Sequence, residues 1–207
     1  MLMEGAGTRP SLELSDAIDF LGAEIATGTS SNLSAVRLHV PVARMGEALP
    51  LMADIARRPR FAAADLDRLR QQRLTSVIQG RSDANTIAAL AFARVLYGTT
   101  HRFGTATMGT AETLRGLTTD DLQAFHRAAY RPDNAALVVV GDVTPATALP
   151  LLEAAFGDWA APASPITHVA QPTPPQRARR EVFLVDKPGA PQSQIRIGRV
   201  GVSRTDR

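Results

Sequence analysis

A proline-rich stretch in the last quarter of the chain most constrains what this sequence can fold into. Residues 160–180 contain five prolines and show no helical or strand periodicity. Proline has no backbone N–H and favours an extended conformation, so this stretch neither continues a helix nor joins the middle of a sheet. The sequence therefore predicts a linker over 160–180, a first domain over 1–159 and the truncated start of a second domain over 181–207.

Composition sets further limits on the class of protein. The chain has 207 residues, of which 44% are hydrophobic, enough to bury a core. Basic and acidic residues are interspersed to a net charge of +3, and Lys187 is the single lysine, so no basic face for nucleic acid is expected. Cysteine is absent, which excludes disulfides, thiolate metal ligands and a cysteine nucleophile. No run of eighteen apolar residues occurs, so no transmembrane segment is expected.

Periodicity of apolar residues gives the elements of the first half. Helical spacing predicts helices over 11–21, 45–56, 66–78 and 87–96. Residues 23–42 instead alternate around the polar turn at 29–32, which predicts a β-hairpin.

The second half predicts further helices and strands. Thr118 can cap a helix that runs to Ala129, and Thr144-Pro145 can start one that ends at Phe156. The continuously apolar run 135–140 predicts a strand covered on both faces, and 181–202 predicts two strands around a Pro-Gly turn. The expected fold class is α+β, with an antiparallel-rich sheet packed against helices in two layers.

Several segments, in order and at matching separations, carry a resemblance to a known family. They are MLMEGAGT at 1–8, Gly22-Ala23, Tyr97-Gly98 with His101 and Gly109, the strand signature in 130–143, and FGDW at 156–159. Together they resemble the insulinase, pitrilysin and mitochondrial-processing-peptidase family of zinc metallopeptidases. That family carries an inverted H-x-x-E-H zinc motif on a helix.

The resemblance also implies what is missing. The H-x-x-E-H motif would end one residue before Met1, so the chain is expected to be a fragment of a bacterial member. The family's third zinc ligand, a glutamate, would fall at Ser76, and 69–80 contains no carboxylate. Serine is not a usual zinc ligand. The resemblance is therefore strongest to non-catalytic members, with no catalytic or metal-ligating residue in this fragment and zinc held by an active partner or by the missing motif.

The hairpin is the candidate binding element. The resemblance places the family's substrate-binding edge strand at Glu24, Ile25, Ala26, Thr27 and Gly28. An edge strand can pair with an extended peptide through its backbone, largely irrespective of the peptide's side chains. An ordinary solvated edge strand is an equally open interpretation.

The sequence pattern favours structural roles for the other polar residues considered as site candidates. The histidines His39, His101, His126 and His168 show no ligand spacing, which a metal site would need. Asp120 and Asp121 suit the positive end of a helix, and Gly141-Asp142 suits a turn after a strand. A Ser-His-Asp triad has no G-x-S-x-G turn to support it.

The predicted function is a non-catalytic homologue or subunit that binds peptide and completes the chamber of a homologous active peptidase, either a separate subunit or a fused half. Two alternatives stay open. The chain is a fragment of an active zinc endopeptidase whose motif lies upstream, or a structural subunit like the core proteins of the respiratory bc complex. A bacterial periplasmic location is expected over a cytoplasmic one, and the substrate and partner are not encoded in the sequence.

Overall fold

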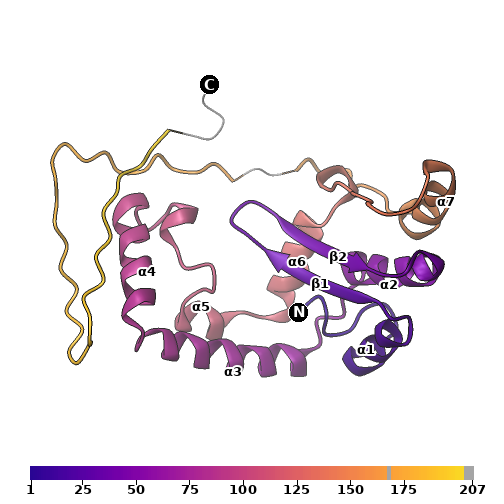
Figure 1. Ribbon diagram of the computed structural model, residues 1–207, viewed down its shortest axis with the longest axis horizontal. Helices are drawn as coiled ribbons and strands as arrows, with labels where there is room; N and C mark the ends of the chain where they lie inside the picture. The colour runs from indigo at the N-terminus through magenta and orange to yellow at the C-terminus, as the bar shows by residue number, and fades with distance from the viewer. Residues whose placement is uncertain (167–168, 203–207) are drawn as a thin grey trace. The chain divides into compact units, whose positions relative to one another are not determined.

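The computed structural model describes residues 1–166 and 169–202 (Figure 1). The chain forms two compact units. Unit 1 consists of residues 1–69 and 117–168, and unit 2 of residues 70–116 and 169–207. The domain boundaries expected around 160–180 stay a prediction.

The order of elements agrees with most of the sequence expectations. Unit 1 contains α1 (Ser11–Phe20), β1 (Glu24–Thr29), β2 (Ser34–His39), η1 (Val42–Arg44), α2 (Met45–Arg57), α6 (Thr119–Ala129), η3 (Pro132–Asn134) and α7 (Pro145–Phe156). Unit 2 contains α4 (Ala84–Tyr97), η2 (Arg102–Gly104) and α5 (Ala111–Gly116). Helix α3 (Ala63–Gly80) passes from the first unit to the second. The short helix α5 was not predicted.

The core of unit 1 lies between α1, the hairpin and α2. β1 and β2 are antiparallel, in a register that runs from Glu24↔His39 to Thr29↔Ser34. Ile25 lies opposite Leu38, and both pack into one apolar cluster with α1 and α2. The buried members of this cluster are Ala6, Leu14, Ile18, Leu21, Ile25, Ala48, Leu51 and Ile55. Burial of these side chains fixes where the start of β1 lies against α1.

Helix α7 is fastened to the end of α2. A smaller cluster of Leu49, Ala53 and Ala155 joins the two helices. Arg57 donates to the Ala155 carbonyl at 2.8 Å and pairs with Asp158 at 2.6 Å. Its guanidinium also lies 5.9 Å from the centre of the Trp159 ring. Arg57, at the end of α2, therefore holds the FGDW segment at 156–159, which was predicted to end the first domain, against α2.

Helix starts follow the capping residues in the sequence. Thr118 and Asp121 form a capping box at the start of α6, and Thr144 and Thr147 form one at the start of α7. Asp83 caps α4 by accepting from the backbone N–H groups of Asn85 and Thr86. These bonds satisfy N–H groups that the first turn of a helix leaves without a partner.

The apolar run 135–140 differs from its prediction. It has no regular secondary structure and forms no sheet with any other described residue. Val138 and Val140 are 81% and 92% exposed. A strand needs a neighbour to accept and donate its backbone hydrogen bonds, and the described residues supply none here. The predicted covering on both faces is therefore wrong for this structure.

The C-terminal segment shows the same difference. The two predicted strands in 181–202 are irregular, and Leu184 and Ile197 are exposed. Two strands alone are marginal without a third element to cover them. The described residues nevertheless form an α+β fold, with many helices and one small antiparallel sheet, and the expected class is confirmed.

Unit 2 is held by smaller interactions. Tyr97, His101 and Phe103 form an aromatic trio with ring centres 5.1 to 5.4 Å apart. Arg177 donates to the carbonyl of Val95 at 2.8 Å, which ties the C-terminal segment to α4. Within residues 1–166 and 169–202, no helix has both the length and the apolar character needed to cross a bilayer.

Candidate functional site

The predicted edge strand is present and has one open side. β1 pairs with β2 on one edge, and no other described strand pairs with it. The Ser30 N–H donates to the Leu33 carbonyl at 2.8 Å, just beyond the last strand pair. Since bonded and non-bonded pairs alternate along an antiparallel ladder, the backbone groups of Ile25, Thr27 and Thr29 point away from β2. These groups are the ones that an added strand would meet.

A pocket of about 270 Å³ lies beside the start of this strand. It is formed by α1, by the beginning of β1 and by Met3. The lining residues are Met3, Ser11, Leu14, Ser15, Ile18, Asp19, Ala23, Glu24 and Ile25. Leu14, Ile18 and Ile25 are buried, whereas Ser15, Asp19 and Glu24 are exposed. The pocket therefore has an apolar floor and a polar, acidic rim.

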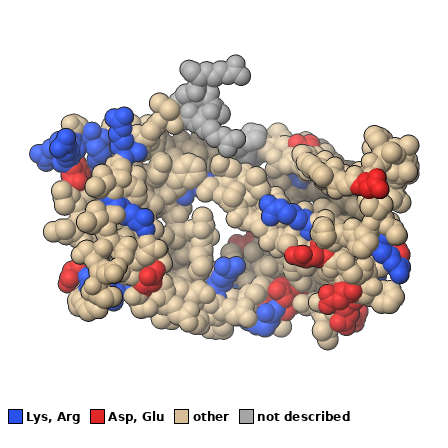
Figure 2. Space-filling view, viewed as in Figure 1, with Lys and Arg blue, Asp and Glu red and all other residues tan. Residues whose placement is uncertain are grey.

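The acidic groups around the pocket differ in their partners. Glu4, near the pocket, pairs with Arg68 and accepts from the Ser11 hydroxyl at 3.3 Å. Among the described residues, Asp19 and Glu24 form no ion pair. Figure 2 shows acidic side chains gathered over the part of unit 1 that carries α1. Asp19 and Glu24 therefore leave negative charge on the rim that is not held in an ion pair with a described residue.

The position expected for the third zinc ligand is occupied by an exposed serine. Ser76 lies on α3, and its hydroxyl donates to the Gln72 carbonyl at 3.0 Å, one turn earlier. No three His, Cys, Asp or Glu side chains among the described residues come close enough together to hold a metal ion. This part of the chain therefore does not fit a zinc site.

Two of the histidines are structural parts of the packing. His101 is buried in the aromatic trio, and its Nδ1 accepts from the Phe103 N–H at 3.0 Å. His126 stacks on Tyr130 and lies 2.8 Å through Nε2 from the Ala56 carbonyl. Burial lowers the pKa of His126 from its ordinary value, so the ring is neutral and Nε2–H donates to that carbonyl. His39 is exposed at the end of β2, and His168 lies outside the described residues.

Asp120 and Asp121 lie in the first turn of α6, and Asp121 forms part of its capping box. The Asp121 carboxylate accepts from the Thr118 N–H at 2.9 Å and from its hydroxyl at 2.7 Å. These bonds lower the pKa of Asp121, with the bond to the hydroxyl as the larger cause. Asp120 is exposed in the same turn, and Asp142 is exposed in the turn after 135–140. The helix-end interpretation of the pair is consistent with these contacts.

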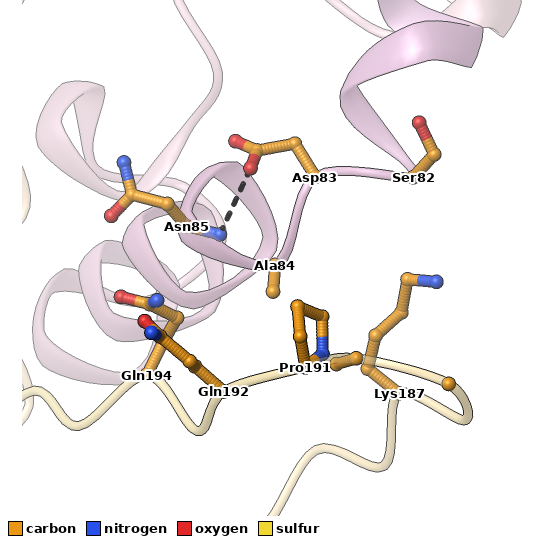
Figure 3. A pocket seen from close by; sticks show the side chains of 10 residues that line it. Ser82, Asp83, Ala84, Asn85, Lys187, Pro191, Gln192 and Gln194 are labelled. Atoms are coloured by element: carbon orange, nitrogen blue, oxygen red, sulfur yellow. Dashed lines mark hydrogen bonds between the residues drawn. The ribbon is translucent and has the colours of Figure 1, made fainter.

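A second hollow, of about 250 Å³, lies within unit 2 between the start of α4 and the C-terminal segment (Figure 3). Lys187, Pro191 and Gln192 line it from that segment. The Asp83 carboxylate at its other wall is already bound to the first turn of α4, and the Thr86 hydroxyl is the main cause of its lowered pKa. The Asp83 carboxylate therefore serves the helix start.

Sequence reasoning found the strand but missed the pocket. The contribution of α1 comes from Leu14 and Ile18, one turn apart, which were interpreted only as helix periodicity, and from the neighbouring Asp19. Glycine at position 22 makes the link to β1 very short, and this shortness was the available signal that α1 lies alongside the strand.

Comparison with known proteins shows which family this chain is similar to. Residues 116–207 match the family model described as the peptidase M16 inactive domain. An uncharacterized zinc protease of Streptomyces coelicolor is 25% identical over the whole of this chain and 45% of its own length. The chain thus spans about half the length of the curated relatives that it matches.

Solved structures agree in fold. A peptidase M16 inactive domain from Pseudomonas fluorescens is 26% identical, with a TM-score of 0.73 over 83% of this chain and 42% of that one. A protease from Helicobacter pylori has a TM-score of 0.75 over 84% of this chain and 42% of that one at 17% identity, which shows the fold alone. The family model, the zinc-protease relatives and the solved structures thus agree that this chain is similar in sequence and fold to the M16 peptidases, the insulinase-like metallopeptidases.

Proposed function

We propose that this chain is part of a non-catalytic M16 half, which binds an extended peptide along β1 and completes the substrate chamber of a homologous active peptidase half. The observation that carries the peptide-binding role is the open edge of β1 beside a pocket with an apolar floor. Backbone groups on that edge can pair with a peptide strand, and the pocket can take one of its side chains.

The non-catalytic role has separate support. Ser76 occupies the position expected for the third ligand, and the described residues do not fit a zinc site. The matching family model carries the description of an inactive domain. A half of this kind would contribute walls and peptide contacts, while the partner would supply the metal.

A second candidate function is a part of an active zinc endopeptidase. The relatives from Streptomyces coelicolor and Mycobacterium leprae carry the name zinc protease, and this favours the candidate. Sequencing the reading frame upstream of residue 1 in the source DNA distinguishes the two. An intact H-x-x-E-H there, with about one zinc per molecule in the longer purified protein, would establish the active enzyme. A degenerate motif would support the non-catalytic half.

The peptide-binding role can be tested at Thr27. Thr27→Pro removes a backbone N–H that faces the open edge, and proline is tolerated on the free side of an edge strand. Thr27→Val keeps that N–H and is the matched control. Fluorescein-labelled extended peptides of about ten residues serve as probes, with binding followed by fluorescence anisotropy. We expect Thr27→Pro to weaken binding and Thr27→Val to leave it unchanged.

Equal binding by the two variants would show that the peptide does not use this edge. Absence of binding by the unchanged chain would remove the peptide-binding role altogether. The periplasmic location is a further proposal, and fractionation of the source bacterium with an antibody to this chain tests it.

A further inference from the structure

We infer that the adjacent arginines Arg179 and Arg180 form a processing site, at which an endopeptidase that cleaves after basic residues cuts this chain. Peptide binding on β1 is not needed for this cleavage, so the two proposals stand or fall separately. Three features support the site: the accessible backbone around the pair, the two unengaged side chains, and the contrast with a second arginine pair at the end of a helix.

The backbone around the pair is open to a peptidase. Residues 171–186 belong to no helix or strand, and none of their backbone groups bonds to another backbone group of the described chain. Pro172, Pro174 and Pro175 precede the pair and favour an extended backbone. Extended peptides are bound through free backbone groups, and exposed segments of this kind are preferred sites of cleavage.

The side chains of the pair are free for recognition. Arg179 and Arg180 are exposed and form no hydrogen bond, ion pair or ring contact with a described residue. Arg177, by contrast, pairs with Glu181 and donates to the Val95 carbonyl at 2.8 Å. An endopeptidase that cleaves after arginine binds the guanidinium to a carboxylate in its specificity pocket. An unengaged arginine enters such a pocket without first breaking contacts of its own.

The other pair of adjacent arginines, Arg57 and Arg58, has the same chemistry in a folded setting. Arg57 is the last residue of α2 and pairs with Asp158 at 2.6 Å. Arg58 donates to Asp54 at 2.8 Å. Cleavage between or after these two residues requires local unfolding of the helix end and loss of both pairs. We therefore expect structure, and not sequence, to decide which of the two pairs is cut.

Three further basic residues lie in the described part of the segment after the pair. Lys187 is followed by Pro188, whose ring nitrogen hinders cleavage of the bond before it. Arg196 donates to the side chain of Asn85. Arg199 is exposed and stands alone in the sequence, so it serves as the control below.

The chemical step is hydrolysis of the peptide bond that follows Arg179 or Arg180. One water is consumed: its hydroxyl goes to the arginine carbonyl, which becomes a C-terminal carboxylate, and its proton goes to the released nitrogen, which becomes a new amino terminus. Arg177 then lies before the cut and Glu181 after it, so their ion pair becomes a contact between two separate chains. The covalent link from residues 1–166 to the C-terminal segment is lost.

The first experiment measures whether structure directs cleavage to this pair. The purified chain is treated with a low amount of trypsin, which cleaves after arginine and lysine, and cuts within residues 1–202 are followed over time by mass spectrometry. We expect the first cut after Arg179 or Arg180, with the Arg57–Arg58 pair still intact.

Two variants sharpen this measurement. The double variant Arg179→Gln with Arg180→Gln should be cut about tenfold more slowly, because most of the remaining sites need local opening. Arg199→Gln removes one exposed arginine from the same segment and should be cut at the unchanged rate. Far-UV circular dichroism checks that both variants keep the fold. A first cut at Arg57–Arg58, or an equal loss of rate in the two variants, would overturn the inference.

The second experiment asks whether the site is used in the source bacterium. The protein is recovered from cells with an antibody to residues 1–166, and its C-termini are determined by mass spectrometry. We expect a fraction that ends at Arg179 or Arg180, and the loss of this fraction in cells that carry the double variant. Recovery of protein that is uncut at the pair would overturn the processing site, even where trypsin cuts the purified chain there.

Discussion

Units 1 and 2 both contain helices, but the described strands lie in unit 1, and the two units differ in what holds them together. Each buried apolar side chain of the described residues lies in unit 1. Unit 2 relies on an aromatic trio, a capped helix start and hydrogen bonds from arginines. In both units the local sequence determines where helices form, whereas the free energy of unfolding depends on how much apolar surface is buried. We therefore expect unit 1 to carry most of the stability and unit 2 to open first.

The largest expected difference between the two units is in the loss of unfolding free energy when the same substitution, isoleucine to alanine, is made in each. Ile55 in α2 is fully buried, whereas Ile195 in the C-terminal segment is 78% exposed. Ile55→Ala should lower the free energy of unfolding by about 2–5 kcal/mol, and Ile195→Ala should change it by less than about 0.5 kcal/mol. Urea titration followed by circular dichroism measures both. Similar losses at the two positions would show that unit 2 has a core of its own.

Alanine substitutions at Gly7 in unit 1 and Gly116 in unit 2 should give the next largest difference in the free energy of unfolding. Gly7 has a φ of +56°, and an added Cβ would lie 2.5 Å from Oδ2 of Asp54, a side chain whose Oδ1 accepts from Arg58. Gly7→Ala should therefore lower the free energy of unfolding by about 1–3 kcal/mol. Gly116, at the end of α5, has open space around it. Gly116→Ala is the control and should be neutral or slightly stabilising, as judged by thermal unfolding.

Helix caps should show smaller effects in both units. Thr144→Ala removes the hydroxyl that accepts from the Thr147 N–H, and should lower the free energy of unfolding by about 1 kcal/mol. Thr144→Ser keeps a hydroxyl and should behave like the unchanged chain. In unit 2, Asp83→Ala should speed hydrogen exchange at the amides of Asn85 and Thr86. Unchanged exchange at those two amides would mean that α4 does not depend on its cap.

The smallest expected effect is a pH dependence confined to unit 1. Burial lowers the pKa of His126 below its ordinary value of 6.5, so the folded state binds the proton less readily than the unfolded state. Stability from this group is complete above the unfolded pKa and declines as pH falls from there towards the folded pKa. His126→Gln should flatten this decline between pH 7 and pH 5. Thermal midpoints across that range measure it, and an unaltered slope in the variant would assign the decline to another group.

Local signals in the sequence predicted most of the elements. Thr118 and Thr144 were predicted at helix starts because their side chains can satisfy the first N–H groups. Asp83 does the same for α4 and was not predicted. The hairpin followed from alternation around a polar turn, and its register matches the burial of Ile25 and Leu38. The predicted edge strand at 24–28 lies within β1.

Non-local features could not be predicted in the same way. The run 135–140 has the composition of a buried strand, but a strand exists only with a neighbour, and composition does not say which segment that is. The pocket depends on where α1 lies against β1, which only the packed core determines. The contact between Arg57 and Asp158 joins residues about a hundred positions apart, and no spacing rule reaches that far.

The exposed segment 135–140 also bears on aggregation of the protein during refolding. Its valines and its backbone groups are available to any other extended apolar chain, including the same segment of another copy. Encounters between copies increase with the square of concentration, whereas folding of one copy does not depend on concentration. Dilution during refolding therefore favours the folded molecule over precipitate, and a charged residue in place of Val138 would act in the same direction without dilution.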